Sequence, residues 1–397
     1  MTLGDVVTEI RNGIDLEQFD RPTRTATWPI SRIETISEAR IDLDRVKYVS
    51  PTPQQVQRYQ LRSGDILFSH INSPEHIGKT ALFTGQHPLI HGINLLLLRA
   101  DTARCCPAYL DALLKSSGVR LHFRMRCKKA VNQASLNQDD ILSLQVRLPS
   151  LSDQQRIAGR VEQADRLVRT RRYALELTDT FLPAAFLELF GDPVKNPRCF
   201  DHVELEDELE CIESGFSPIC EGPRESVSQW AVLGLGAVTT GTFKPVENKR
   251  LPDDVPPRPE LEVHDGDVLV TRKNTYELVA ACALVRTPPQ RLLLPDTIFR
   301  FRSKQGSRLS PVFLWGLFSF PSFRKRVQGL ASGSAGSMPG ISKDKFMGIN
   351  CPVPPLPLQQ KFAALVERVE QLRAVQREAL RHAEHLFASL LDCAFSG

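Results

Sequence analysis

The sequence predicts an α+β fold in which two β-rich globular domains are each followed by one long helix. Three observations predict it: the 397-residue chain repeats itself, short strand-like runs fill most of each repeat, and each repeat ends in a long segment with helical periodicity. A chain of this length is long enough for two or three domains, each with its own core. The hydrophobic content of 42% and the charged content of 24% are typical of globular proteins and speak against disordered and fibrous classes.

The internal repeat is an ordered series of matched segments. The shift between the two copies is 202 residues at first and 205 later, as a few inserted loop residues would require. Similarity at one place is common by chance, but an ordered series at a slowly drifting shift indicates duplication. The matched segments are "TLGDVVTEIRNGI" (2–14) with "ELEDELECIESGF" (204–216), "LRSGDILFSHINS" (61–73) with "VHDGDVLVTRKNT" (263–275), "IGKTALF" (77–83) with "VAACALV" (279–285), and "ILSLQVRLPSLSDQQRIAGRV" (141–161) with "FMGINCPVPPLPLQQKFAALV" (346–366).

The first part of each copy reads as a β-rich domain. Runs such as "DILFSHI", "LLLLRA", "DVLVTR" and "TIFRFR" are short, apolar and bounded by Gly, Pro and Asn, which is typical of strands separated by turns. The predicted division is a first globular domain at 1–147, a first long helix within 148–192, a second globular domain at 193–350 and a second long helix within 351–397.

The two helical segments each carry one apolar stripe. Apolar residues recur three and four positions apart, which is the period of an amphipathic helix. A helix of some 35 residues is about 50 Å long and cannot bury such a stripe alone. We therefore expect the two helices to pack on each other as an antiparallel coiled coil that gives the molecule a pseudo-twofold repeat. The alternative is that they are ordinary bundle helices packed on separate cores. The predicted packing residues are Ile157, Val161, Ala164, Val168, Phe362, Val366, Val369, Leu372 and Val375.

Several motifs together resemble those of the specificity (S) subunits of type I restriction-modification systems. Both "LPSLSDQQ" (148–155) and "VPPLPLQQ" (353–360) place a pair of glutamines at the start of a long helix, each after a domain with a Gly-Asp turn. "QASLNQDDI" (133–141) leads into the first of them, whereas the second copy departs from this pattern with "SAGSMPGIS" (334–342). The resemblance covers nearly the whole chain and rests on the order and spacing of short motifs.

The resemblance implies a DNA-binding protein without catalytic activity of its own. Two target-recognition domains, held apart by an antiparallel coiled coil, would each read one half of a bipartite target in double-stranded DNA. The coiled coil would set the spacing, which suits recognition modules placed about one helical turn of DNA, roughly 34 Å, or a multiple apart. The implied partners are the methyltransferase (modification) subunits and the restriction (translocase and endonuclease) subunits. No cofactor is expected here, because S-adenosylmethionine and ATP would belong to those partners.

No catalytic or metal-binding motif is recognisable. "IGKT" (77–80) would need a glycine at position 73 to end a phosphate-binding loop, and Ser73 stands there. The nine cysteines show no spacing suited to zinc, and no apolar run approaches the about 18 residues of a membrane-spanning helix. With no signal peptide recognised, a cytoplasmic location is expected.

Polar and basic residues in the loops are the candidates for DNA contacts. Lys and Arg position a protein on the phosphates, while Arg, Asn, Gln and Lys can also read base edges. For each such residue an ordinary solvated charge is the alternative. The basic clusters "FRMRCKK" (123–129) and "FRKR" (323–326) could flank DNA or cap helix ends. The DNA-binding candidates are Arg11, Asn12, Arg21, Arg24, His70, Asn72 and Lys79 in the first copy and Lys244, Lys249, Arg250, Arg272, Lys273 and Asn274 in the second.

Two other functions stay open from the sequence. The chain could be a two-headed coiled-coil scaffold that binds proteins instead of DNA, or it could be a methyltransferase or nuclease by itself. The net charge of +4 does not decide between them, because strongly basic DNA-binding domains carry a larger surplus.

Overall fold

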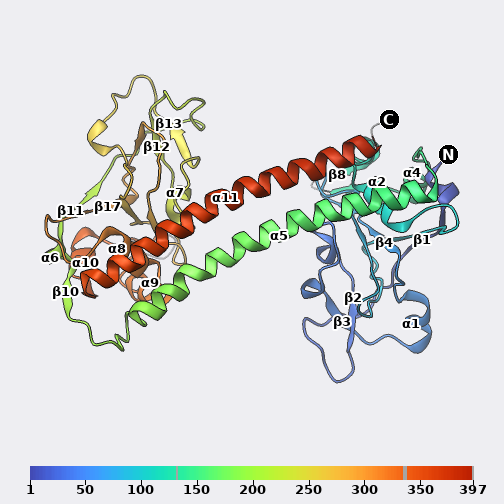
Figure 1. The fold of residues 1–397 in the computed structure, drawn as a ribbon, viewed down its shortest axis with the longest axis horizontal. Coiled ribbons are helices and arrows are strands. Elements are labelled where there is room, and N and C mark those ends of the chain that lie inside the picture. Colours follow the sequence, from blue (N-terminus) through green and yellow to red (C-terminus); the bar gives the residue numbers. More distant parts are fainter. Residues whose placement is uncertain (131–132, 334–337, 396–397) are drawn as a thin grey trace. The chain divides into compact units, whose positions relative to one another are not determined.

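The structure is a computed structural model that describes residues 1–130, 133–333 and 338–395. Parts of the segments "VNQASLN" and "SAGSMPGIS", which differ between the two copies, lie outside the described residues. The chain forms two compact units (Figure 1). Unit 1 comprises Met1–Tyr173 with Arg377–Gly397, and unit 2 comprises Ala174–Gln376. Each unit therefore contains one β-rich part and one half of each long helix.

Unit 1 is built on an antiparallel sheet with the strand order β1-β7-β4-β6. Two helices, α2 and α3, cover one face of this sheet. The sheet strands are β1 (Val7–Asn12), β4 (Asp65–Phe68), β6 (Thr80–Leu82) and β7 (Leu96–Ala100). The other elements are η1 (Leu3–Val6), β2 (Trp28–Ile30), η2 (Glu34–Ile36), η3 (Leu43–Arg45), β3 (Lys47–Val49), α1 (Pro53–Tyr59), β5 (Ile71–Asn72), α2 (Pro107–Lys115), α3 (Ser117–Arg126), β8 (Lys128–Ala130), β9 (Gln133–Ser135) and α4 (Gln138–Leu142).

Unit 2 repeats this sheet with the order β11-β17-β14-β15, again antiparallel. Its strands are β11 (Leu209–Ser214), β14 (Val268–Thr271), β15 (Cys282–Leu284) and β17 (Ile298–Ser303). The other elements are β10 (His202–Glu204), α6 (Leu205–Glu208), β12 (Ala231–Leu233), α7 (Gly236–Thr239), β13 (Asn248–Arg250), η4 (Pro259–Leu261), β16 (Leu292–Leu293), α8 (Pro311–Ser319), α9 (Pro321–Gln328), α10 (Lys343–Met347) and β18 (Asn350–Pro352).

The register of the two sheets confirms the internal repeat. In each first strand a β-bulge interrupts the pairing, between Val7 and Glu9 in β1 and between Leu209 and Cys211 in β11. These positions are 202 residues apart, as the sequence match requires. Bulges bend a strand at a defined place, so their recurrence shows that the two copies share local geometry as well as topology.

Both faces of each sheet are buried. In unit 1, Phe68 and Leu98 lie in the core beneath α2 and α3, whereas Leu67 and Leu97 belong to a second core on the opposite face. Side chains of a strand alternate between faces, and all four of these are fully buried. The continuous apolar runs in the sequence therefore reflect a sheet that is covered on both sides, and not strands with one face exposed to solvent.

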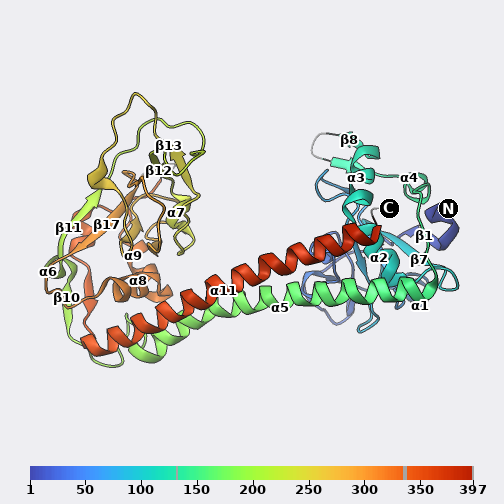
Figure 2. The same cartoon turned by 45° about the horizontal axis from the view of Figure 1, so that its top comes forward.

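The long helices are α5 (Leu151–Phe190) and α11 (Leu356–Phe395), and they lie within the segments predicted to contain them. In unit 1, Val161 of α5 shares a buried cluster with Leu391 of α11. In unit 2, the Arg373 guanidinium of α11 bonds Thr178 of α5. The numbering rises along one helix as it falls along the other, so the helices pair antiparallel within each unit, and Figure 2 shows them side by side.

Each helix pair also packs on the globular part of its unit. Ala158 belongs to the sheet core of unit 1, and Phe186 and Phe362 belong to that of unit 2. The rings of Phe186 and Phe362 meet edge to face, with centroids 5.5 Å apart. The helices therefore pair with each other as expected, and each pair also packs on the core of its unit, so the alternative of unpaired bundle helices is wrong.

The buried stripes follow most of the predicted packing residues. Val161, Ala164, Val168, Phe362, Val366 and Val369 are buried, and Ile157 is half-buried. Leu372 and Val375 differ from the expectation, because their side chains are 49% and 64% exposed. After Val369 the stripe continues through the buried Arg373 instead, four positions further on, which turns positions 372 and 375 toward solvent.

Candidate nucleic-acid interface

The Gly-Asp pair of each copy shapes the turn before the second strand of the sheet. Gly64 and Gly266 have φ values of +94° and +86°, which glycine adopts without strain. The aspartate of each pair closes the turn, since the Arg62 amide donates to Asp65 Oδ2 at 2.7 Å and the His264 amide donates to Asp267 Oδ2 at 2.9 Å. This motif therefore positions the strand that leads into the loop carrying the candidate contacts.

Both aspartates are also anchors for arginines on the neighbouring strand. In unit 1 the Arg99 guanidinium bonds both carboxylate oxygens of Asp65, at 2.7 and 2.8 Å. In unit 2 the fully buried Arg300 pairs with Glu213 at 2.5 Å and with Asp267 at 3.1 Å. Removing one partner of such a buried pair would leave an uncompensated charge. Sequence reasoning missed these networks, although the repeated Gly-Asp signalled one half of each.

The matching asparagines, Asn72 and Asn274, hold the loops in which they lie. Asn72 Oδ1 accepts from the Ser73 amide at 2.8 Å, and its Nδ2 donates to Ser69 Oγ at 3.0 Å. Asn274 Oδ1 accepts from the Thr275 amide at 2.9 Å, and this side chain is buried. Their repetition thus has a local structural cause, because an Asx side chain can cap its own turn.

Of the other candidates of unit 1, two make bonds within the protein and a third is largely buried. Arg11 Nη2 donates to the Arg58 carbonyl at 2.5 Å, and its guanidinium lies over the Tyr59 ring, 5.1 Å from the centroid. Lys79 Nζ donates to the Ser37 carbonyl at 2.7 Å. His70 is largely buried, and burial lowers its pKa, which favours the neutral ring.

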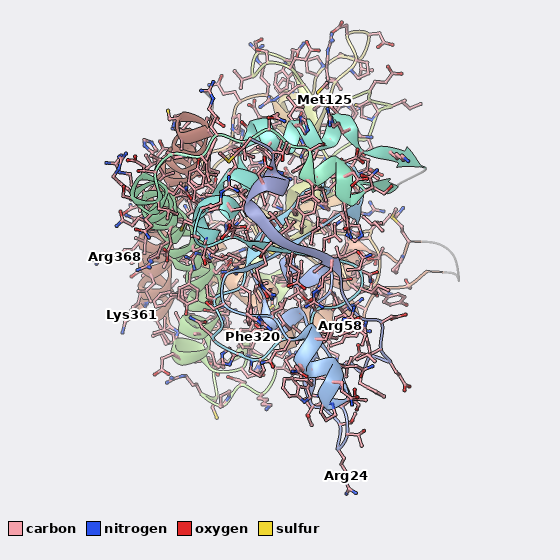
Figure 3. All side chains as sticks on the ribbon, turned by 90° about the vertical axis from the view of Figure 1, so that its right-hand side faces the viewer. Arg24, Arg58, Met125, Phe320, Lys361 and Arg368 are labelled. Atoms are coloured by element: carbon pink, nitrogen blue, oxygen red, sulfur yellow. The ribbon has the colours of Figure 1, made fainter. Side chains whose placement is uncertain are left out.

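The remaining candidates of unit 1 are exposed. Arg21 and Arg24 lie in the loop before β2, and neither forms an ion pair with any residue that the structure describes. Figure 3 shows Arg24 projecting away from the ribbon. Asn12, at the end of β1, is also exposed. These three side chains are available to a ligand in the structure as it stands.

The candidates of unit 2 divide in the same way. Arg272 lies over the Phe299 ring, 5.1 Å from its centroid, and Arg250 Nη2 bonds both carboxylate oxygens of Asp253, at 2.8 and 2.7 Å. Lys244, Lys249 and Lys273 are exposed. The exposed cations follow α7, lie on β13 or follow β14, so they come from separate segments of the unit.

The two basic clusters reach matching loops. Arg124 of α3 and Arg324 of α9 donate to the carbonyls of Glu75 and Glu277, at 3.2 and 3.0 Å. Arg126 and Arg326 lie in the last turns of these helices, where positive charge is favoured by the helix dipole. The arginines thus tie each loop that follows the second strand to the helix behind it.

The repeated glutamine pairs have one buried and one exposed member. Gln154 and Gln359 are fully buried, and Gln155 and Gln360 are exposed. Gln359 Oε1 accepts from the Ser310 amide at 2.9 Å, and its Nε2 donates to the Arg308 and Pro354 carbonyls at 2.7 and 2.8 Å. Gln154 makes the matching three bonds with Cys106, Arg104 and Pro149, at 2.8, 3.0 and 2.9 Å. The motif joins the start of each long helix to the start of α2 or α8.

The described residues contain neither a metal site nor a membrane-spanning helix. In residues 1–130, 133–333 and 338–395, no group of three or more His, Cys, Asp or Glu side chains could hold a metal ion. Within those ranges, no helix combines the length and the apolar character needed to cross a bilayer.

The sequence of the chain is similar to known proteins of one kind. Residues 1–177 match the family model described as Type I restriction modification DNA specificity domain. A predicted type I restriction enzyme MjaX specificity subunit from Methanocaldococcus jannaschii is 28% identical over 410 aligned positions, which cover 100% of this chain and 92% of that protein. The EcoKI type I specificity subunit of Escherichia coli is 28% identical over 193 positions, 46% of this chain and 40% of the relative.

Solved structures show the same fold. The crystal structure of a type I restriction-modification S subunit from M. genitalium matches with a TM-score of 0.60 at 13% identity, over 98% of this chain and 94% of that one. A chain from a study of the assembly of a type I system matches with a TM-score of 0.55 at 19% identity, over 100% of this chain and 96% of that one. Residues 1–177 thus carry a type I restriction modification DNA specificity domain, and over its whole length the chain is similar in sequence to one specificity subunit and in fold to solved S subunits.

Proposed function

We propose that this chain supplies the DNA sequence specificity of a type I restriction-modification complex, with two recognition domains that each read one half of a bipartite target. The recognition domains are residues 1–147 and 193–350. The observation that carries the proposal is the repeat, which reproduces strand order, bulge position and loop anchoring in both units. Two copies of one recognition fold suit two half-sites.

The exposed polar residues are the proposed first contacts with DNA. Arg21, Arg24 and Asn12 in unit 1 and the three lysines of unit 2 are available without breaking an existing bond. Lys and Arg of this kind act on phosphates and make affinity dependent on salt. Arg11, His70, Asn72, Lys79, Arg250, Arg272 and Asn274 would take part mainly by shaping the loops, since their side chains are bonded within the protein or buried.

The long helices have two proposed roles. They set the spacing between the recognition domains, and they offer exposed side chains to the methyltransferase subunits, with restriction subunits joining that assembly. The methylation and cleavage chemistry, with S-adenosylmethionine and ATP, would reside in those partners. A cytoplasmic location is part of the same proposal, because the complex acts on chromosomal and incoming DNA.

Selection from random duplexes by the chain assembled with its modification subunit tests the proposal. The expected product is a motif of two specified half-sites separated by a gap of fixed length. Arg24→Ala should weaken selection at one half-site and Lys249→Ala at the other, and each variant is the control for the half-site that the other one affects. A contiguous motif, or binding that does not weaken as salt rises, would contradict the proposal and favour a protein-binding scaffold.

A further inference from the structure

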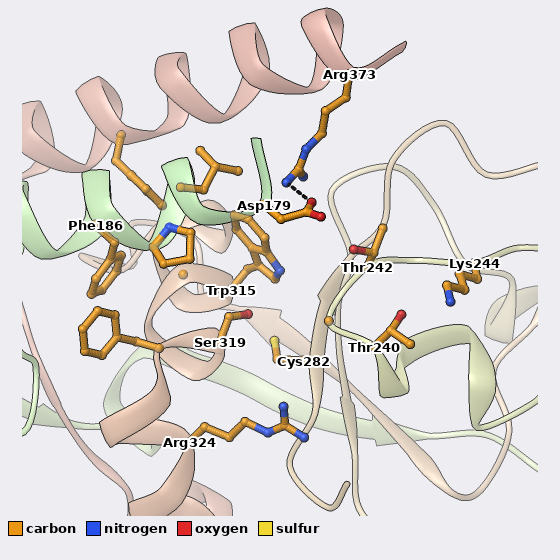
Figure 4. Close-up of a pocket in the computed structure, with 16 residues that line it drawn as sticks. Asp179, Phe186, Thr240, Thr242, Lys244, Cys282, Trp315, Ser319, Arg324 and Arg373 are labelled. Carbon is orange, nitrogen blue, oxygen red and sulfur yellow. Dashed lines mark hydrogen bonds and ion pairs between the residues drawn. The ribbon is translucent and has the colours of Figure 1, made fainter. Parts of the chain in front are cut away.

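Unit 2 contains a cavity of about 580 Å³ where α8 meets the two long helices (Figure 4). Its apolar wall is formed by Leu182 and Phe186 of α5 and Phe362 of α11. Its polar wall includes Trp315 and Ser319 of α8 and Arg324 of α9. A volume of this size lies within the range of about 300–1,000 Å³ that is usual for small-molecule sites.

Three polar atoms of this wall are buried without a partner. Trp315 Nε1, Ser319 Oγ and Arg324 Nε form no hydrogen bond with any residue that the structure describes. The indole and guanidinium nitrogens can only donate. A buried donor left unpaired costs about 1–3 kcal/mol, so three in one cavity call for an acceptor from outside the protein. Asp179, the acidic residue of the lining, is already paired with Arg373 at 2.9 Å.

In the other copy of the repeat, the side chains at these positions are paired with one another. Cys282, Trp315 and Ser319 correspond to Thr80, Asp111 and Lys115 of unit 1. There the Thr80 hydroxyl donates to Asp111 Oδ1 at 2.8 Å, and Lys115 Nζ donates to Asp111 Oδ2 at 2.6 Å. In unit 1 the three side chains at these positions hydrogen-bond to one another. In unit 2 the side chains at the same positions include donors that have no acceptor.

The lining defines the chemistry of a ligand. Arg373 is paired with Asp179 and Glu370, but Lys244 and Arg324 form no ion pair with any residue that the structure describes. The cavity therefore still favours negative charge. Burial raises the pKa of the Cys282 thiol well above its usual range, so the thiol stays neutral and adds to the apolar wall. An aromatic body would fit beside Phe186 and Phe362.

We propose that this cavity binds a small organic anion, a carboxylate carried on an aromatic or branched apolar body. The carboxylate accepts from Trp315 Nε1, Ser319 Oγ and Arg324 Nε once these side chains rotate toward the cavity, because the three atoms have almost no accessible area in the unliganded chain. The body packs between α5, α8 and α11. Such a ligand would touch both long helices and the β-rich part of unit 2. This inference does not depend on DNA recognition, so its failure and that of the proposed function are separately observable.

Calorimetric titration of the full-length chain with 2-naphthoate tests the proposal. One molecule should bind per chain at probe concentrations up to about 1 mM. Trp315→Phe keeps the ring but removes the donor, and Ser319→Ala removes the hydroxyl; each should weaken binding about tenfold, as loss of a bond to a charged group does. Trp230→Phe, a tryptophan outside the cavity lining, is the matched control and should bind like the unaltered chain.

Two further measurements complete the test. The triple exchange Cys282→Thr, Trp315→Asp and Ser319→Lys installs the side chains of unit 1 and should abolish binding, with thermal unfolding used to confirm that the variant folds. The neutral analogue 2-naphthamide should bind at least about tenfold more weakly than 2-naphthoate. Absence of binding, equal binding of the amide, or affinity unchanged in both Trp315→Phe and Ser319→Ala would overturn the proposal. If the triple variant does not fold, the two single variants decide.

Discussion

The first prediction concerns Gln359, the buried glutamine that joins α11 to α8. Replacing it by alanine removes three hydrogen bonds and leaves the Ser310 amide and the carbonyls of Arg308 and Pro354 without that partner. An unsatisfied buried group costs about 1–3 kcal/mol, and carbonyls tolerate the loss better than amides. We therefore expect Gln359→Ala to lower the free energy of opening in this region by about 3–4 kcal/mol.

Hydrogen exchange followed by mass spectrometry measures this effect in each unit separately. At about 1.4 kcal/mol per factor of ten, the peptide covering α8 should exchange about 100- to 1,000-fold faster, and the peptide covering α2 should be unchanged. Gln360→Ala is the matched control, because Gln360 is the adjacent, exposed member of the pair. Gln154→Ala and Gln155→Ala repeat the comparison in unit 1, with the effect on α2. If the buried and exposed glutamines gave the same exchange rates, the assigned role of the pair would be wrong.

Three further predictions address other features. Burial raises the pKa of Glu208, but hydrogen bonds from the Arg308 amide, the Ser307 hydroxyl and the Arg308 side chain outweigh this effect and leave the pKa below 4.5. The stabilisation by the ionised Glu208 should therefore be complete above about pH 4.5 and be lost as the pH falls through the lower pKa of the folded state. The thermal midpoints of the unaltered chain and Glu208→Gln should differ at neutral pH and converge in acid. Gly215→Ala would place a Cβ atom 1.6 Å from the Leu294 carbonyl oxygen and should prevent correct folding of unit 2. Gly159→Ala, in open space on α5, should instead stabilise unit 1 by about 0.5–1 kcal/mol in denaturant titrations. Equal effects of the two substitutions would contradict the close approach of Gly215 to Leu294. Lys273→Ala should reduce the slope of log affinity against log salt by about 0.9 in DNA binding if the lysine contacts one phosphate, with Arg368→Ala as the control that leaves the slope unchanged.

The architecture could be predicted because it follows from periodicity and repetition. The 202-residue shift matched the two sheets to the residue, including the bulges at Val7 and Leu209. The helix stripe failed only at Leu372 and Val375, where the buried position passes to Arg373. Arg373 bonds Thr178 across the helix pair and is buried although it is not apolar. A pattern of apolar residues therefore assigns the buried positions to Leu372 and Val375 instead.

The roles of single residues were harder to predict, because their partners lie far away in the sequence. Gln154 and Gln359 were visible as a repeated motif, yet their purpose depends on amides 48 and 49 residues earlier. The repetition of Asn72 and Asn274 in polar loops suggests contacts with a ligand, but it follows equally from a shared turn. Similarity between two copies of one fold therefore identifies residues that build the loop before it identifies those that read DNA.

The way in which the helices are divided between the units has a consequence for synthesis. Unit 2 is one continuous stretch, Ala174–Gln376, but unit 1 includes residues from 377 onward. Phe395 packs against Tyr109, with ring centroids 5.2 Å apart, and Leu391 packs beside Ala112. At roughly 5–20 residues per second, about 10–40 s of translation separate Tyr173 from the start of that returning helix. The later unit can therefore complete its fold first, while the earlier one waits on the ribosome with the apolar surface of α2 uncovered.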